Sequence, residues 1–208
     1  KKGDRVLVGQ KIGEAGGFVS APIHSSVSGT VKAVEERMTH RGTKDMCVVI
    51  TQDGEYEESE EMAQNAKPDY AHLTQDELVK IVQEAGLVGM GGATFPTHVK
   101  LSVPKDKKAE YIIINGAECE PYLTSDHRVM LESSEEIIGG LKVLLSVFKD
   151  AKAIIGIEDN KMDAVGKLQA LAAKEERIEV AVLHTKYPQG SEKHLIYATT
   201  KREVPSGK

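Results

Sequence analysis

The sequence predicts an α/β protein in two parts, a small all-β domain followed by a doubly wound, mostly parallel sheet. Two observations support this prediction. Short β-branched runs separated by glycines fill residues 1–54, and from Thr74 onward strand and helix patterns alternate. Closely spaced short strands are typical of a small barrel or sandwich, whereas alternating strands and helices are typical of βαβ units. We therefore expect a β domain over residues 1–60, a linker over 61–73 and an α/β domain over 74–208.

Composition excludes several classes of partner. The chain has 208 residues, 40% hydrophobic and 28% charged, with a net charge of −5, so no basic excess favours nucleic acid or an anionic membrane surface. No apolar run approaches the roughly 18 residues of a membrane span. The isolated Cys47 and Cys119 allow neither a disulfide framework nor a Cys-x-x-Cys metal site, and they fit a reducing, cytoplasmic setting. The lone His24 and His98 have no companion at ligand spacing, so we expect no metal site.

The first domain resembles the biotinyl/lipoyl barrel-sandwich fold in the stretches Gly3–Val6, Gly9–Gly13 and Ser28–Val31. Carriers of that family bear their cofactor on a lysine at an exposed hairpin tip. The corresponding stretch here, residues 20–27, has no lysine, so we expect the fold without the carrier role. The expected strands lie around Val6–Val8, Ile12, Phe18–Val19, Val27, Thr30–Val34 and Cys47–Ile50.

An acidic segment, Glu55–Ala66, follows the β domain. It could dock a basic partner, but a solvated linker or the frayed start of a helix is the favoured interpretation. Pro68 ends any helix there.

The α/β domain begins with a capping box, in which Thr74 is the N-cap and Glu77 follows three residues later. The helix that follows is expected to bury Leu78, Ile81, Val82 and Ala85 and to end at Gly86. Further elements are a short helix from about Pro96, strands over 111–114, 153–157 and 178–183, and helices over 134–148 and 160–174.

A glycine loop, Gly89-Met90-Gly91-Gly92, precedes the short helix. Without Cβ atoms its backbone can approach a flat or anionic ligand closely, Pro96 suits the first turn of a helix, and Lys100 adds a positive charge. The loop is neither a dinucleotide fingerprint, since Thr94 stands where a glycine is required, nor a Gly-Lys-Ser/Thr phosphate loop. A tight structural turn is the alternative.

Polar residues follow two of the predicted strands, at the edge where ligands bind in parallel sheets. Asn115–Glu120 follows one strand and Tyr187–Lys193 follows another. Glu118 and Glu120 would share a face in an extended chain and could bind hydroxyls or amides, unless they lie in a solvated loop as N-cap carboxylates. Cys119 between them is interpreted as small core filler. Residues 126–128, Asp-His-Arg, fit either a binding cluster or a charged helix start.

Together these motifs resemble the FMN- and NADH-binding domain of the flavoprotein subunit of respiratory complex I, and more closely the RnfC subunits of Rnf electron-transport complexes. The resemblance rests on Gly89-x-Gly-Gly-Ala-x-Phe-Pro with Lys100, and on the words at Gly17–Gly29, Asn115–Thr124 and Lys186–Gly190. It covers essentially the whole chain. It implies a Rossmann-like FMN-binding domain preceded by a barrel-sandwich domain.

The resemblance also implies roles for individual residues. The glycine loop would lie along FMN with Lys100 near its polar edge, Asn115 and Glu118 would bind on the flavin side, Glu120 would hold the nicotinamide end of NADH, and Phe95 would stack on a ring of the dinucleotide. A Tyr-x-x-Gly-x-Glu element would close the site. No side chain is implied as a catalytic base. The implied cofactor-binding residues are Gly89, Gly91, Gly92, Phe95, Lys100, Asn115, Glu118, Glu120, Tyr187, Gly190 and Glu192. Complex I has acidic residues where this chain has Ala117 and Ser191, so contacts made there are absent.

For function, the resemblance implies a subunit of an NADH-dependent oxidoreductase and ion translocase. Such a subunit passes electrons between NADH and ferredoxin, in either direction, through FMN and 4Fe-4S clusters. Since the cysteine runs of those clusters are absent, we expect the 208 residues to be part of a longer protein and to bind FMN weakly alone. Membrane subunits would be its partners, placing it peripherally on the cytoplasmic face of a bacterial membrane. A cobalamin reductase of metabolosomes, or a domain that only docks subunits, are the alternatives.

Overall fold

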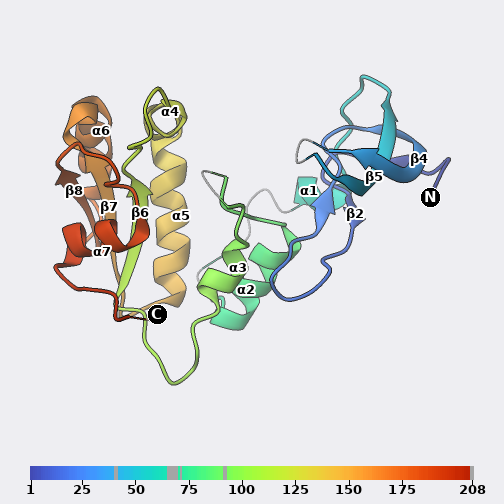
Figure 1. The fold of residues 1–208 in the computed structure, drawn as a ribbon. Helices are drawn as coiled ribbons and strands as arrows, with labels where there is room; N and C mark the ends of the chain where they lie inside the picture. The colour runs from blue at the N-terminus through green and yellow to red at the C-terminus, as the bar shows by residue number, and fades with distance from the viewer. Residues whose placement is uncertain (40–41, 65–69, 71, 91–92, 207–208) are drawn as a thin grey trace. The chain divides into compact units, whose positions relative to one another are not determined.

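A computed structural model describes residues 1–39, 42–64, 70, 72–90 and 93–206. The chain forms two compact units, which are described separately (Figure 1). The first comprises Lys1–Asp69 and Thr74–Ser102, and the second comprises Tyr70–Leu73 and Val103–Lys208. The domain boundaries expected above stay a prediction, since this division groups residues by proximity in space and not by domain family.

The β-rich part of the first unit contains a three-stranded antiparallel sheet, in the order β1-β4-β5, and a two-stranded antiparallel pair, β2-β3. Its strands are β1 (Arg5–Val6), β2 (Lys11–Gly13), β3 (Ile23–His24), β4 (Gly29–Met38) and β5 (Lys44–Gln52). Alternate β-branched side chains pack inward, so that Val6 and Val31 are buried. The strand predicted at Phe18–Val19 is wrong, because residues 16–19 form bends and the Phe18 carbonyl accepts a hydrogen bond from His98 Nε2 (2.9 Å).

Three helices complete the first unit, α1 (Glu60–Gln64), α2 (Gln75–Glu84) and α3 (Thr97–Leu101). The predicted capping box of α2 is confirmed, since Thr74 Oγ1 accepts from Glu77 N (3.3 Å) and Glu77 Oε2 accepts from Thr74 N (2.8 Å). The helix ends at Glu84, and Gly86 follows its C-cap residue Ala85 with a positive φ of 68°, which suits glycine. Of the predicted buried face, Leu78 and Val82 are buried.

The remaining two residues of that face, Ile81 and Ala85, are exposed, so this part of the prediction is wrong. The reason is that α2 buries only a narrow stripe. Leu78 and Val82, which are spaced i, i+4, already fill this stripe, so Ile81 and Ala85 lie outside it. Part of the acidic segment is bonded to the β-rich part and does not serve as a free linker. Its residues 57 and 59 pair with Val8, since Val8 N donates to Glu57 O (2.8 Å) and Ser59 N donates to Val8 O (2.9 Å).

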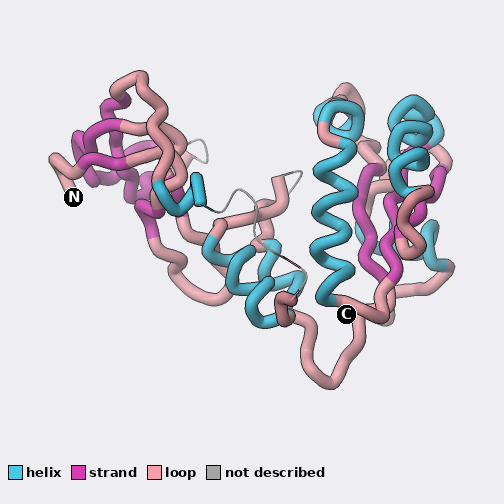
Figure 2. The backbone as a smooth tube through the Cα atoms, turned by 180° about the vertical axis from the view of Figure 1, so that it is seen from behind, coloured by secondary structure: helices cyan, strands magenta, loops and turns pink. Residues whose placement is uncertain are grey.

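The second unit is built on a parallel sheet with strand order β6-β7-β8, as the three continuous apolar runs predicted. Its strands are β6 (Tyr111–Gly116), β7 (Lys152–Glu158) and β8 (Ile178–Leu183), and its helices are α4 (Ser125–Glu132), α5 (Ser134–Val147), the 3-10 turn η1 (Asp159–Lys161), α6 (Met162–Ala172) and α7 (Glu192–Thr200). In Figure 2 the strands of this sheet run between the helices. The mixed α/β class is thus confirmed. Within the described residues, no helix is both long enough and apolar enough to cross a membrane.

Helices cover both faces of the parallel sheet, because successive side chains of a strand point to opposite sides. On one face Ile112 and Ile114 pack with Leu141 of α5 and Leu168 of α6. On the other face Ile113 packs with Leu195 of α7. The carboxyl ends of the three strands therefore meet at one edge of a sheet that is buried on both sides. Residues 115–127, 158–161 and 184–192 lie there and comprise the strand ends, the connecting loops and the first residues of the helices that follow. We call these three segments the strand-end edge.

Candidate functional site

The predicted glycine loop lies in the first unit, and backbone hydrogen bonds close it at its base. Gly89 N donates to Phe95 O (3.0 Å), Thr97 N donates to Leu87 O (2.9 Å), and Val88 forms a bridge with Pro96. We call residues 89–95 the glycine loop. Gly91 and Gly92 fall outside the described residues. The described segments on either side of them, residues 87–89 and 95–97, are therefore paired with each other directly before α3.

The described site residues of this loop are accessible. Among the described residues, a Cβ added to Gly89 would meet only Phe95 O, at 3.8 Å, so these residues leave room there. Phe95 is 39% exposed, and the Lys100 ammonium lies 6.0 Å from the centroid of its ring. Pro96 occupies the N-cap of α3 rather than its first turn, because its ψ of 126° is extended, so the prediction is wrong by one residue.

The β-rich part of the first unit supports α2 and α3, which flank the glycine loop. His98 of α3 is 1% exposed and bonds Phe18 O, and its ring meets the Phe18 ring edge-on at 5.6 Å. Gly86 faces the carbonyl of Pro22, where an added Cβ would lie at 2.8 Å. The segment 20–27, which carries the lysine in biotinyl-type carriers, thus lies in part against the end of α2.

In the second unit, Asn115 and Gly190 join two loops of the strand-end edge. Asn115 Nδ2 donates to Gly190 O (2.7 Å), and Gly190 N donates to Cys119 Sγ (3.2 Å). A Cβ on Gly190 would lie only 2.3 Å from Ala117 O, so this position requires glycine for the close approach of two backbones. Both predicted residues therefore hold the loops together.

Glu118 caps helix α4. Its Oε1 accepts from Asp126 N (2.8 Å) and Ser125 Oγ (3.3 Å), and its Oε2 accepts from His127 N (3.3 Å). The carboxylate is only 8% exposed and lies where the helix dipole favours a negative charge. Of the two interpretations left open by the sequence, N-cap carboxylate and ligand-binding group, the geometry realises the first for its side-chain oxygens.

The chain is not extended at Glu118, so the condition under which Glu118 and Glu120 would share a face does not hold. The reason is a turn: Cys119 N donates to Ala117 O (3.0 Å), which bends the chain at Glu118 and ends the extended alternation. Glu120 is exposed, and among the described residues its carboxylate makes no hydrogen bond or ion pair. Glu120 is thus the acidic side chain of this pair that is available to a ligand.

Residues 126–128 form the first turn of α4, which resolves the second open alternative in favour of a charged helix start. His127 Nε2 contacts Asp163 Oδ1 (2.9 Å), and Arg128 pairs with Glu132. Burial raises the pKa of Asp126 above its ordinary value, the negative charge of Glu118 adds to the shift, and Lys161 opposes it.

A buried ion pair that the sequence analysis missed lies at the end of β7. Glu158 is 0% exposed and Lys161 6% exposed, and Lys161 Nζ lies 3.4 Å from Glu158 Oε2. A signal was present in the sequence, because Glu158 directly follows a buried apolar run, as Asn115 does in β6. Nearby, hydrogen bonds from Thr185 lower the pKa of Asp159 below its ordinary value.

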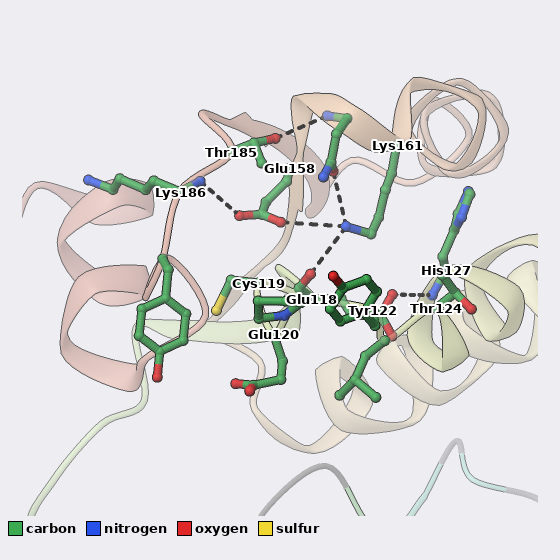
Figure 3. Close-up of a pocket in the computed structure, with 14 residues that line it drawn as sticks. Glu118, Cys119, Glu120, Tyr122, Thr124, His127, Glu158, Lys161, Thr185 and Lys186 are labelled. Carbon is green, nitrogen blue, oxygen red and sulfur yellow. Dashed lines mark hydrogen bonds and ion pairs between the residues drawn. The ribbon is translucent and has the colours of Figure 1, made fainter.

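A cavity of about 380 Å³ opens at the strand-end edge (Figure 3). Glu118, Glu120 and Tyr187 line it together with Lys161 and the fully exposed Tyr122, whose φ of 67° is positive. Its remaining lining residues are Cys119, Pro121, Leu123, Thr124, His127, Glu158, Asn160, Thr185 and Lys186. Glu192 begins α7 and is exposed, but it does not line this cavity. An acidic group and two aromatic rings on one polar cavity suit a flat ligand with hydroxyl or amide groups.

Comparison with protein families identifies the fold of this site. The model of the Nuo51 FMN-binding domain matches residues 82–208, more than half of the chain. The chain belongs to this family. A second family model, that of the RnfC barrel sandwich hybrid domain, matches residues 1–55 of the same chain.

Relatives of this family member match it along its whole length. The C subunit of the Na⁺-translocating ferredoxin:NAD⁺ oxidoreductase complex of Acetobacterium woodii is 51% identical, and the match covers 100% of this chain and 46% of that protein. Its counterpart in the proton-translocating complex of Clostridium ljungdahlii is 45% identical and covered to 45%. The C subunit of an ion-translocating oxidoreductase complex of Vibrio cholerae is 42% identical and covered to 26%. The chain thus spans less than half the length of these relatives.

The chain is also similar to a solved structure. A chain of the NAD⁺-reducing NiFe hydrogenase in its air-oxidized state superposes with a TM-score of 0.52 at 26% identity. The match covers 65% of this chain and 26% of that chain. The resemblance to the complex I and Rnf families is therefore confirmed at the level of family and homologues.

Proposed function

We propose that this chain forms the FMN- and NADH-binding part of an RnfC-type protein. In the whole protein, electrons would pass between NADH and ferredoxin through FMN and through 4Fe-4S clusters held outside these 208 residues. The observation that carries the proposal is the strand-end edge of a chain from the FMN-binding-domain family, where Glu120 and Tyr187 line one cavity. The names of two relatives, both C subunits of ferredoxin:NAD⁺ oxidoreductase complexes, support this proposal.

The residues present fit a flavin and a nicotinamide dinucleotide. Both ligands combine flat rings with hydroxyl, amide and phosphate groups, and the cavity offers tyrosine rings beside a carboxylate. The open space at Gly89 supports the close approach of a ring to the glycine loop. When bound, FMN supplies the exchange between two-electron transfer with NADH and one-electron transfer with clusters.

The protein's own residues would bind and orient these groups. Glu120 would accept hydrogen bonds from the nicotinamide end of NADH, because its carboxylate is exposed. Phe95 would stack on a ring of the dinucleotide, and Lys100 would offer a positive charge to a phosphate. In the first unit, the backbone of Gly89, Gly91 and Gly92 would admit a flavin ring. In the second unit, Tyr187 and Glu192 would contact the ligand, and Asn115 and Gly190 would support them by joining their loops.

Glu118 takes a different part in this proposal from the one its family position implies. Since its side-chain oxygens already accept three hydrogen bonds, we infer that it supports the flavin side of the pocket by fixing the start of α4. No side chain is required as a general base, because hydride transfer needs none.

The setting of the protein follows from the same proposal. Membrane subunits of the complex and ferredoxin or a similar carrier would be its partners, and it would lie peripherally at the cytoplasmic face of a bacterial membrane. We also infer that the strands of residues 1–55 form a barrel-sandwich hybrid, as the family match to that range supports.

The experiment that tests the function mixes FMN and NADH with the protein at its full natural length. NADH should bleach the flavin near its visible absorbance maximum, whereas a protein that only docks subunits would neither bind FMN nor bleach it. A cobalamin reductase would bleach the flavin as well but would pass electrons to a corrinoid rather than to ferredoxin. Absence of FMN binding and of bleaching contradicts the proposal.

The site assignment is tested by Glu120→Gln, which removes a charge at nearly constant shape. We expect the dissociation constant for NADH to rise about tenfold, on the order of one lost charged hydrogen bond, with FMN affinity unchanged. The matched control is Glu176→Gln, an equally exposed change before β8 at the opposite edge of the sheet. If Glu120→Gln leaves both affinities at the wild-type value, the assignment is wrong.

A further inference from the structure

The buried pair formed by Glu158 and Lys161 belongs to no motif of the proposed site, yet it lies beneath its cavity. Glu158 ends β7, and Lys161 closes the 3-10 turn that follows. Burying two charges is costly, and a buried ion pair contributes little stability compared with apolar side chains of similar volume. The pair therefore calls for an explanation other than stability.

Its hydrogen bonds reach both loops that carry the proposed site residues (Figure 3). Lys161 Nζ donates to the backbone carbonyl of Glu118 (3.3 Å) and to Asn160 Oδ1 (3.0 Å). On the other side, Glu158 Oε1 accepts from the backbone N–H of Lys186 (3.2 Å). Glu118 lies two residues before Glu120, and Lys186 lies directly before Tyr187. One ion pair thus connects the loops after all three strands.

The ammonium group of Lys161 acts on the protein rather than on a ligand. An ammonium has three N–H donors, and three acceptors lie within 3.0–3.4 Å of this one: Asn160 Oδ1, Glu118 O and Glu158 Oε2. Glu158 in turn uses one oxygen for Lys161 and the other for Lys186 N. The pair is saturated by neighbouring protein groups, which is the arrangement of a fixed brace and not of an anion site.

We propose that Glu158 and Lys161 are positioning residues, which hold the Glu120 and Tyr187 loops at the separation required to bind the nicotinamide dinucleotide. This inference rests on the proposed function of the same edge. Removing the pair would remove the charged link between the two loops, so that the contacts of Gly190 with Asn115 and Cys119 would carry more of the burden of fixing their relative position. Small displacements of a binding group weaken binding steeply, so the effect appears in dinucleotide affinity even where the fold survives.

The test separates positioning from stability by comparing single and double variants of the full-length protein. Lys161→Met leaves the Glu158 charge buried without its partner, so both the thermal midpoint and NADH affinity should fall. The double variant Glu158→Leu with Lys161→Met removes both charges, so its midpoint should return toward the wild-type value. Its equilibrium dissociation constant for NADH should nevertheless stay raised by about tenfold or more. FMN content and kcat should change less than KM.

A matched control is the exposed pair of Lys142 in α5 with Glu175 after α6, in which Lys142 Nζ lies 2.7 Å from Glu175 Oε1. Lys142→Met with Glu175→Leu should leave both the midpoint and the NADH affinity unchanged. If the double variant of the buried pair recovers wild-type NADH affinity together with stability, the pair is only structural and the proposal is overturned.

A second variant covers the case in which the double variant does not fold. Glu158→Gln keeps the shape and an acceptor for Lys186 N but loses the ionic partner of Lys161. We expect this variant to lose NADH affinity by about threefold or more. An unchanged, wild-type affinity would overturn the proposal. The wild-type protein distinguishes the two levels of inference. If it binds no NADH, the proposed function fails, whereas NADH binding that is indifferent to the pair refutes only the positioning role.

Discussion

The glycine loop and the strand-end edge hold backbone in place by different means. The glycine loop is closed by main-chain hydrogen bonds and supported by a neutral contact between His98 and Phe18. The strand-end edge is held by charged side chains, namely Glu118 at the start of α4 and the pair of Glu158 with Lys161. The first arrangement depends on shape, whereas the second depends on charge in addition to the close backbone contact at Gly190.

The difference follows from the local topology of each region. A hairpin-like turn pairs its own donors and acceptors, as Gly89 N does with Phe95 O, so it needs few side chains. At the strand-end edge, loops run from strands to helix N-termini, whose first N–H groups have no partner within the helix. Carboxylates such as Glu118 satisfy them, and the cost of burying such groups is met by pairing them.

The largest expected effect sharpens this comparison with one glycine from each region. Gly190→Ala places a Cβ 2.3 Å from Ala117 O, and a backbone atom cannot move aside as a flexible side chain can. We expect the free energy of unfolding to fall by about 3 kcal/mol. Gly89→Ala should leave it nearly unchanged, because the nearest atom lies at 3.8 Å.

Thermal and denaturant unfolding of the two variants provide the measurement, and FMN titration extends it. If Gly89→Ala weakens FMN binding without affecting stability, the ligand rather than the fold requires that glycine. Equal stability losses for the two alanines would contradict the comparison.

A smaller effect is expected at His98, the neutral support of the glycine loop. His98→Ala removes the hydrogen bond to Phe18 O and leaves a cavity where a 1% exposed ring lay, for a loss of about 2 kcal/mol. His98→Gln keeps an N–H at a similar reach and should lose about half as much. For each variant, the difference in denaturant midpoint from the wild type should be the same at two salt concentrations, since no ion pair is involved. A strong salt dependence would show that this region depends on charge after all.

The smallest effects are expected for two aspartates of the strand-end edge, and they have opposite signs. The pKa of Asp159 is lowered, so its charged form stabilises the folded state, and this contribution is lost as pH falls through the lowered value. The pKa of Asp126 is raised, so its charged form costs stability above that value. At neutral pH, Asp159→Asn should lower and Asp126→Asn should raise the thermal midpoint, each by about 1–2 °C.

A pH series of thermal unfolding checks both signs. As pH falls, the difference between wild type and Asp126→Asn should vanish first, because the raised pKa is passed first and a protonated aspartate is uncharged like asparagine. The difference for Asp159→Asn should persist to lower pH. Shifts of the same sign for the two variants would contradict the assignment of the two carboxylates.

Much of the fold could be predicted because its signals are local. The apolar runs of β6, β7 and β8 and the capping box at Thr74 are confirmed within a residue or two. Helix α7 was missed because Glu192–Thr200 has only a weak apolar stripe, with Leu195 as its single buried residue. Its helical state is fixed by packing on the sheet rather than by its own pattern.

The location of candidate site residues could be predicted where they follow a strand, as for Asn115 and Gly190, although the hydrogen bond between these two was not predicted. The hydrogen bond between Glu118 and Ser125 could not be predicted, because Ser125 begins a helix seven residues later. Likewise the role of Lys161 depends on a carbonyl 43 residues away, and no spacing rule connects the two. Contacts between loops of different strands are set by the order of the strands in the sheet, which only the folded chain reveals.

The contact of Gly86 with Pro22 has a consequence for how such proteins exchange parts during evolution. The matches to the two family models end at residue 55 and begin at residue 82, yet residues on both sides of that interval pack within one unit. Besides the approach of Gly86 to Pro22 O, Lys11 pairs with Glu84 at 3.0 Å. Recombination at residue 55 or 82 would break these contacts, whereas a junction just after Ser102 would preserve them. The β-rich part together with α2, the glycine loop and α3 is therefore the part of the chain that would have to be exchanged as a whole to keep these contacts.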